Sequence, residues 1–294
     1  MTAPHPPRAD VSQSKALLRA WLSSRLSPDA LGWLDQQIAL IEAGERPQQL
    51  AIAVGLAPRK TSKADLELTP AEHEAGRAAR EGLDPTDWSI DQAARILLAL
   101  ASFRGDERAF ASGVDRIFPS AEIGEQIALL KGLPLFPAAD LLQPRAAEGV
   151  RSAMQPIFEA IAHRNPYPRE VFSEAQWNQM VVKTLFIGSR LAPIQGLDAR
   201  RNTDLARMLI DYADERQAAG RTISPELWRC VAPFAGPPEV ARLASILAQG
   251  REAERTGAAL ALAECPRPEA RAALAAHPDL AAAMASGRIG WDTL

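Results

Sequence analysis

The sequence predicts an all-α protein built as an array of antiparallel helix pairs, HEAT-like or solenoid-like toward the C-terminus. Apolar residues recur every three or four positions in nearly every segment, which is the spacing of a helix face. The alternation with β-branched residues that marks strands is almost absent. The chain has 294 residues, 47% of them hydrophobic, which is enough for one large domain or two ordinary ones.

The N-terminal part begins with a polar, proline-rich stretch over residues 1–11, which we expect to be a disordered lead. Leucine, isoleucine and tryptophan then recur at helical spacing over 17–26 and 31–41, and a further apolar stripe covers 90–101. These patterns predict three helices. We assign residues 12–144 to an N-terminal helical layer.

The segment 57–70 is polar and flanked by prolines, so we expect an exposed connection with Arg59, Lys60 and Lys63 in solvent. At its end, a threonine, a proline and a glutamate at positions 69, 70 and 72 form the pattern of a capping box with proline at the first helical position. A helix should therefore begin at Pro70.

The central part, residues 145–234, contains the least ordinary helices. Pro156 lacks a backbone donor and should kink or split the helix that the apolar spacing places over 145–164. In a helix over 173–188, Asn178 falls among apolar residues. An unpaired buried amide costs about 1–3 kcal/mol, so Asn178 must have partners. It either ties a neighbouring loop or lines an internal pocket.

Two cations of this central part also break the helical pattern. Lys183 is flanked by apolar residues, so its stem either extends to water or needs a carboxylate partner. Arg216 projects close to Leu209 and Tyr212 in a helix over 203–219. It is either an end residue that gains from the helix dipole or an arginine that binds a carboxylate or phosphate in a cleft.

Residues 235–294 change character, with short Ala/Leu-rich pieces that each end at glycine or proline. They predict two or three short antiparallel helices stacked as in HEAT repeats.

Several classes of protein are disfavoured by composition. The net charge of −3 leaves no basic excess for phosphates, so we expect no nucleic-acid partner. The N-terminus lacks a signal peptide, and no apolar stretch is long enough to span a bilayer. The two cysteines, Cys230 and Cys265, lie far apart and form no CxxC motif. These features predict a cytoplasmic protein without a disulfide.

Catalytic motifs are also missing, among them the P-loop, G-x-G-x-x-G, G-x-S-x-G and H-E-x-x-H. The one acidic cluster, Asp211, Asp214 and Glu215, has the spacing by which some all-α prenyl-transferring enzymes hold Mg²⁺ and a diphosphate. It occurs once and faces outward on the helical wheel. We therefore expect neither a metal nor a cofactor.

A family resemblance covers about half the chain, mainly residues 145–234. The residues that carry it are RSAM at 151–154, FEAIA at 158–162, NPYP at 165–168, WNQMVVKTLF at 177–186, GLDAR at 196–200, LARMLIDYADER at 205–216, AAGR at 218–221 and SPELWR at 224–229. The tail HPDLAAAMASGRIGWDTL is also similar. In these segments the chain resembles the EboA-like metabolite-traffic family of bacteria.

The resemblance implies a role in metabolite traffic. Members occur beside a UbiA-like prenyltransferase and several enzyme-like partners, and are thought to help deliver metabolite precursors toward the periplasm. The matching polar and aromatic positions are candidates for one cleft between central helices: Arg151, Asn165, Tyr167, Trp177, Asn178, Lys183, Asp211, Tyr212, Glu215, Arg216 and Arg229.

Three functions remain open at this point. The first is a binding or adaptor protein whose partners are a small-molecule metabolite and proteins of the same pathway. The second is an enzyme on a prenyl- or polyol-derived metabolite, which requires Lys183, Glu215 and Arg216 to converge. The third is a scaffold for partner enzymes, which requires a large exposed apolar patch. We favour the first, because buried polar positions occur without a catalytic motif around them.

Overall fold

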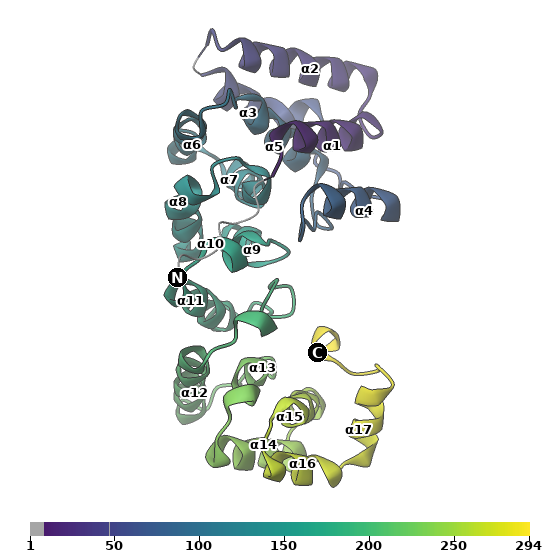
Figure 1. The fold of residues 1–294 in the computed structure, drawn as a ribbon, viewed down its shortest axis with the longest axis vertical. Helices are drawn as coiled ribbons and strands as arrows, with labels where there is room; N and C mark the ends of the chain where they lie inside the picture. Colours follow the sequence, from purple (N-terminus) through teal and green to yellow (C-terminus); the bar gives the residue numbers. More distant parts are fainter. Residues whose placement is uncertain (1–8, 47) are drawn as a thin grey trace. The chain divides into compact units, whose positions relative to one another are not determined.

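The computed structural model describes residues 9–46 and 48–294, and over these residues the protein is all-α (Figure 1). They form seventeen α-helices and five short 3₁₀ helices and no strand, with one isolated β-bridge between Asp65 and Ser89. The predicted fold class is thereby confirmed. None of the described helices combines the length and hydrophobicity that crossing a bilayer requires.

The chain divides into two compact units, the first ending at Ser173 and the second beginning at Glu174. The boundaries expected at 144 and 234 stay predictions, as does the HEAT-like arrangement of the C-terminal helices.

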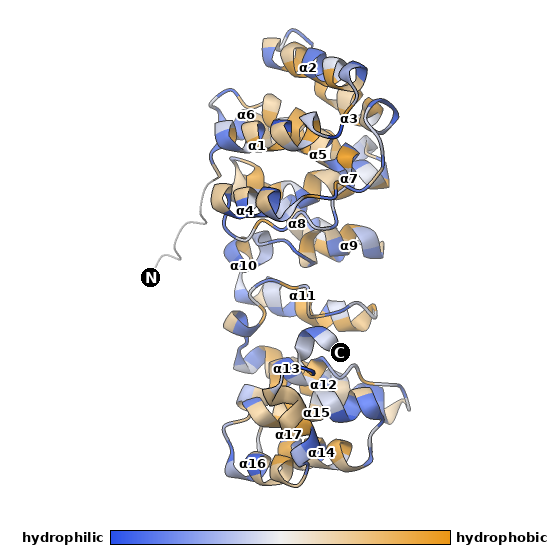
Figure 2. Ribbon diagram, turned by 90° about the vertical axis from the view of Figure 1, so that its right-hand side faces the viewer, coloured by the Kyte–Doolittle hydropathy of each residue, from blue (hydrophilic) through white to orange (hydrophobic). Residues whose placement is uncertain are grey.

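The first unit holds ten α-helices. They are α1 (Val11–Ser23), α2 (Pro28–Ala43), α3 (Gln49–Lys60), α4 (Pro70–Ala79), α5 (Ile90–Ala101), α6 (Glu107–Asp115), α7 (Ile123–Lys131), α8 (Ala139–Arg151), α9 (Gln155–Ala162) and α10 (Tyr167–Val171). Helix α5 is central and packs against α1, α2, α3 and α7. Every residue of α5 except Gln92 is buried, and Figure 2 shows hydrophobic residues along α1 and α5.

The second unit holds the remaining seven. They are α11 (Glu174–Phe186), α12 (Thr203–Ala218), α13 (Leu227–Val231), α14 (Pro237–Gln249), α15 (Glu252–Glu264), α16 (Pro268–Ala275) and α17 (Pro278–Ala285). Helix α15 is the central element here, in contact with α13, α14, α16 and α17. Its residues from Gly257 to Leu262 are all buried.

Local signals predicted several helix ends well. The capping box at Thr69 is present, with the backbone N–H of Thr69 donating to Glu72 at 2.8 Å. Pro156 stands at the start of α9 and ends the expected continuous helix, because α8 stops at Arg151. Residues 1–8 of the predicted lead over residues 1–11 lie outside the described residues. Asp10 already caps α1, which begins at Val11.

Other expectations need correction. The segment 57–70 is only partly a connection, because α3 continues to Lys60 and Leu66 is buried. Its basic residues are nevertheless exposed as expected. The C-terminal part holds four α-helices rather than two or three. Phe186, an apolar residue of the helix predicted over 173–188, is 73% exposed.

Candidate functional site

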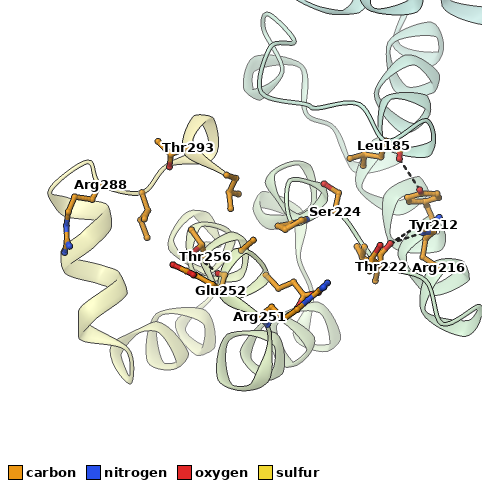
Figure 3. A pocket seen from close by; sticks show the side chains of 17 residues that line it. Leu185, Tyr212, Arg216, Thr222, Ser224, Arg251, Glu252, Thr256, Arg288 and Thr293 are labelled. Atoms are coloured by element: carbon orange, nitrogen blue, oxygen red, sulfur yellow. Dashed lines mark hydrogen bonds and ion pairs between the residues drawn. The ribbon is translucent and has the colours of Figure 1, made fainter. Parts of the chain in front are cut away.

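The second unit contains a pocket of about 860 Å³, which we call the second-unit pocket. Its wall is formed by the end of α12, the following loop, the start of α15 and the last residues of the chain (Figure 3). Tyr212 and Arg216, both expected cleft residues, line it. Every residue that lines this pocket belongs to the second unit.

Tyr212 and Arg216 form one side of the pocket, one helical turn apart on α12. Arg216 donates from Nε and Nη2 to the backbone oxygen of Thr222, at 3.0 and 2.8 Å. Its guanidinium carbon lies 6.0 Å from the centre of the Tyr212 ring. The Tyr212 hydroxyl donates to the backbone oxygen of Leu185 at 3.3 Å (Figure 3). Both side chains are thus half-buried and oriented.

The chain reverses directly after α12, and this turn brings Thr222 to Arg216. Gly220 has a φ of 64°, a left-handed conformation that favours glycine. The N–H of Arg221 donates to the oxygen of Arg216 at 2.8 Å, and that of Gly220 to the oxygen of Gln217 at 3.0 Å. This pair of bonds is the Schellman motif. The sequence around Gly220 therefore shapes one edge of the pocket.

Helix α15 supplies the opposite side. Gly257 allows the loop after α12 to approach, since a Cβ there would lie 2.6 Å from Cβ of Pro225. At the start of α15, the backbone N–H and the guanidinium of Arg251 each donate to Glu254 at 2.8 Å. The Arg251 guanidinium lowers the pKa of the Glu254 carboxyl, so the pair is ionised at neutral pH. Glu254 is therefore already neutralised by its own neighbour.

Two cations of the pocket are not neutralised in this way. Among the described residues, neither Arg216 nor Arg288 forms an ion pair; Arg288 donates from Nε to the hydroxyl of Ser286 at 3.2 Å. Hydroxyl and apolar side chains share the same wall, namely Ser224, Thr256, Thr293, Leu185, Ile223 and Ile289. This combination suits a small molecule with an anionic group and an apolar part.

Asn178 is buried as expected, and its partner is a loop residue. Its Nδ2 donates to Oδ1 of Asn202 at 3.1 Å, and Nδ2 of Asn202 donates back to Oδ1 of Asn178 at 2.9 Å. Asn202 also caps α12 by accepting from the N–H of Leu205 at 2.8 Å. Asn178 therefore fixes the start of α12 and does not line the second-unit pocket.

Trp177 and Arg229 also have local partners in the second unit. The guanidinium of Arg200 lies 4.6 Å from the centre of the fully buried Trp177 ring. Arg229 donates from Nε and Nη2 to both carboxylate oxygens of Asp198, at 2.8 and 2.7 Å. Burial raises the pKa of Asp198, but the hydrogen bonding and charge of Arg229 and the charge of Arg201 together outweigh burial, so the pKa is lowered. These contacts hold the segment before α12 against α13.

The three expected cleft residues that belong to the first unit do not line the second-unit pocket. Asn165 donates from Nδ2 to the oxygens of Leu130 and Ala160, at 3.2 and 3.0 Å, and accepts from the N–H of Tyr167 at 3.0 Å. Tyr167 is 1% exposed, and its hydroxyl donates to the oxygen of Ala139. Arg151 is exposed at the end of α8.

The remaining expected residues lie on α11 and α12 outside the second-unit pocket. Asp211 and Glu215 are exposed, as the helical wheel predicted. Lys183 is half-buried, and burial lowers the pKa of its ammonium. Neither Lys183 nor Glu215 lines the pocket beside Arg216. Within the described residues, no group of three His, Cys, Asp or Glu side chains could hold a metal ion.

Sequence reasoning missed the half of the pocket that comes from the C-terminal part of the chain. Arg251, Glu252, Thr256, Arg288 and Thr293 line it, and none was a candidate. They reach the pocket through the packing of α15 and the segment after α17, which local patterns do not reveal. The tail beyond α17 did resemble the family, and that was the one available signal.

The fold and the pocket together define an all-α protein with a pocket lined by both polar and apolar residues. The chain belongs to the EboA family: the family described as metabolite traffic protein EboA matches residues 14–232. This range includes Tyr212 and Arg216 and ends before Arg251. Comparisons with curated proteins and with solved structures found no match.

Proposed function

We propose that the protein is a binding or adaptor protein of bacterial metabolite traffic. It works in the cytoplasm and helps deliver a metabolite precursor toward the periplasm, and prenyl-derived precursors are the first class to test. The second-unit pocket takes the metabolite, and the helical array offers docking surface to partner proteins of the same pathway.

The observation that carries this proposal is the half-buried Arg216 beside Tyr212 in a pocket of about 860 Å³. The volume is that of a site for a drug-sized molecule. Arg216 uses two of its nitrogens on one neutral oxygen and has no carboxylate partner among the described residues. An anionic group of the metabolite would supply that partner, with the Tyr212 ring and Ile223 against its apolar part. Membership of a metabolite-traffic family supports the same function.

The test is untargeted mass spectrometry of small molecules released from the protein purified from a bacterial host. We expect a species that wild type retains and that Arg216→Gln retains at least about tenfold less, since a charged hydrogen bond is worth about 1.5–3 kcal/mol. Arg207→Gln is the matched control, because Arg207 is exposed on the same helix outside the pocket.

Arg216→Lys sharpens the result, because lysine keeps the charge and loses the planar pair of donors. We expect it to retain an intermediate amount. Circular dichroism checks that each variant is folded. Wild type that retains no small molecule, or equal retention by folded Arg216→Gln and wild type, contradicts the proposal.

A further inference from the structure

The first unit contains a separate pocket of about 650 Å³, which we call the first-unit pocket. It is lined by the end of α2, the start of α3, the end of α5 and helix α6. Leu50, Phe110 and Ile117 form an apolar floor, and each of them is less than a tenth exposed. None of the expected cleft residues lines this pocket, and it shares no lining residue with the second-unit pocket.

Three arginines line the first-unit pocket: Arg46, Arg104 and Arg116. None of them has a carboxylate partner among the described residues, whereas many other arginines of this unit are ion-paired, such as Arg19 with Asp35. Asp106 is the acidic residue of the wall. Its carboxylate caps α6 by accepting two backbone N–H groups at 2.9 and 3.0 Å. Positive charge therefore exceeds negative charge by two in the pocket.

Arg104 is held in place by neutral groups. Its Nη2 donates to the backbone oxygen of Ile41 at 2.7 Å, near the end of α2. The guanidinium lies directly on Gly44, where a Cβ would stand 1.9 Å from Nη2. Gly44 also has a φ of 72°, which favours glycine. The backbone at the end of α2 thus positions the Arg104 guanidinium without a carboxylate.

We propose that the first-unit pocket binds a phosphate-bearing anion. Guanidinium groups match phosphate oxygens through parallel hydrogen bonds, and three of them in one pocket without carboxylate partners suit an anion of more than one charge. Arg104 is oriented before the ligand arrives, and Arg116 is steadied by its bond to the hydroxyl of Ser112 at 3.1 Å. The three arginines are exposed, so an anion reaches them directly from solvent.

The test is isothermal titration calorimetry of the full chain with inorganic pyrophosphate. We expect binding that weakens as salt is raised. Arg116→Gln should weaken it at least about tenfold, which corresponds to about 1.4 kcal/mol. Gly44→Ala should also weaken it, because the new methyl group displaces the Arg104 guanidinium. Arg108→Gln is the matched control, since Arg108 is exposed on the same helix and does not line the pocket.

Arg216→Gln separates this site from the second-unit pocket and should leave pyrophosphate binding within twofold of wild type. No binding of pyrophosphate by wild type excludes a free phosphate as the ligand, and it overturns the proposal if wild type also fails to bind anionic vesicles. So does a loss confined to Arg216→Gln, which would place pyrophosphate in the second unit. An equal loss in Arg108→Gln and Arg116→Gln overturns it as well, because it would indicate non-specific attraction.

The phosphate can belong to a free metabolite or to a lipid headgroup, and sedimentation with vesicles distinguishes the two. Vesicles of phosphatidylglycerol in phosphatidylcholine are compared with phosphatidylcholine alone. Binding to the anionic vesicles that Arg116→Gln abolishes and Arg108→Gln preserves supports the site with a headgroup as its source. Pyrophosphate binding without vesicle binding supports the site and indicates that its ligand is a free phosphate compound. Failure of both probes overturns it.

Discussion

The two units use their polar side chains in different ways. In the first unit the two most deeply buried arginines each have a carboxylate partner: Arg80 pairs with Glu170, and Arg95 pairs with Asp91 and donates to two backbone oxygens at 3.0 and 3.1 Å. In the second unit Arg216 is half-buried and bonds one backbone oxygen beside a pocket. Burial of a polar group is therefore a weak sign of function. Hydrogen-bond donors that remain unused beside a cavity are a stronger sign of function.

The buried pair of Arg95 and Asp91 should give the largest effect on stability. Replacing Arg95 by methionine leaves a buried carboxylate without its partner, which costs about 3–5 kcal/mol. Urea unfolding measures the loss. Arg108→Ala is the control and should stay within about 0.5 kcal/mol of wild type, because Arg108 is exposed. A loss of unfolding free energy below about 1 kcal/mol for the Arg95 variant would mean that the stability of the first unit does not depend on the pair of Arg95 and Asp91.

The amide pair of the second unit should come next. Asn178→Ala removes both hydrogen bonds between the two amides and should lower the free energy of unfolding by about 1–3 kcal/mol, since each bond contributes about 0.5–1.5 kcal/mol. Asn202→Asp is the sharper variant, because its carboxylate still caps α12 and accepts from Asn178 but cannot donate back. If Asn202→Asp were as stable as wild type, the return bond to Asn178 would contribute nothing.

A partly exposed ion pair in the first unit should contribute about 1 kcal/mol. Arg25 donates to both carboxylate oxygens of Glu72 at 2.7 Å, and this hydrogen bonding lowers the pKa of Glu72 from 4.5 to about 2. Because the folded-state pKa is depressed, the stabilisation is present above pH 4.5 and is lost as pH falls toward 2. The difference in unfolding free energy between wild type and Glu72→Gln should shrink over this window. A difference that stays constant with pH would exclude this contribution.

Arg216 should matter least for stability. It is half-buried and bonds a single neutral oxygen, so Arg216→Gln should lower the free energy of unfolding by about 1 kcal/mol or less. Retention of the metabolite should nevertheless fall, in the mass-spectrometric comparison described above. A loss of stability as large as that of the Arg95 variant would place Arg216 with the structural residues of the first unit.

Features set by neighbours in sequence were predictable. The capping box at Thr69, the break before Pro156 and the position of Arg216 near Tyr212 each depend on residues within one or two turns. The helical wheel also placed Asp211 and Glu215 outward correctly. Such features follow from helix geometry alone.

Features set by packing were not predictable. Arg251, which precedes α15, and Arg288, which follows α17, reach the second-unit pocket from far along the chain. Gly257 matters because the loop at Pro225 lies against it. Asn178 was predicted to need a partner, yet the sequence did not identify Asn202. Phe186 belongs to the apolar pattern of α11 and is still exposed. A helical wheel shows which residues share a face, but it does not show which faces are covered by other helices.

The most direct test of the central claim is a crystal structure of the protein purified together with its retained small molecule. The account predicts electron density for that molecule in the second-unit pocket, with an anionic group within hydrogen-bonding distance of the Arg216 guanidinium and the apolar part against Tyr212 or Ile223. Density for the molecule at another place, with Arg216 bonded to Thr222 alone, would contradict it.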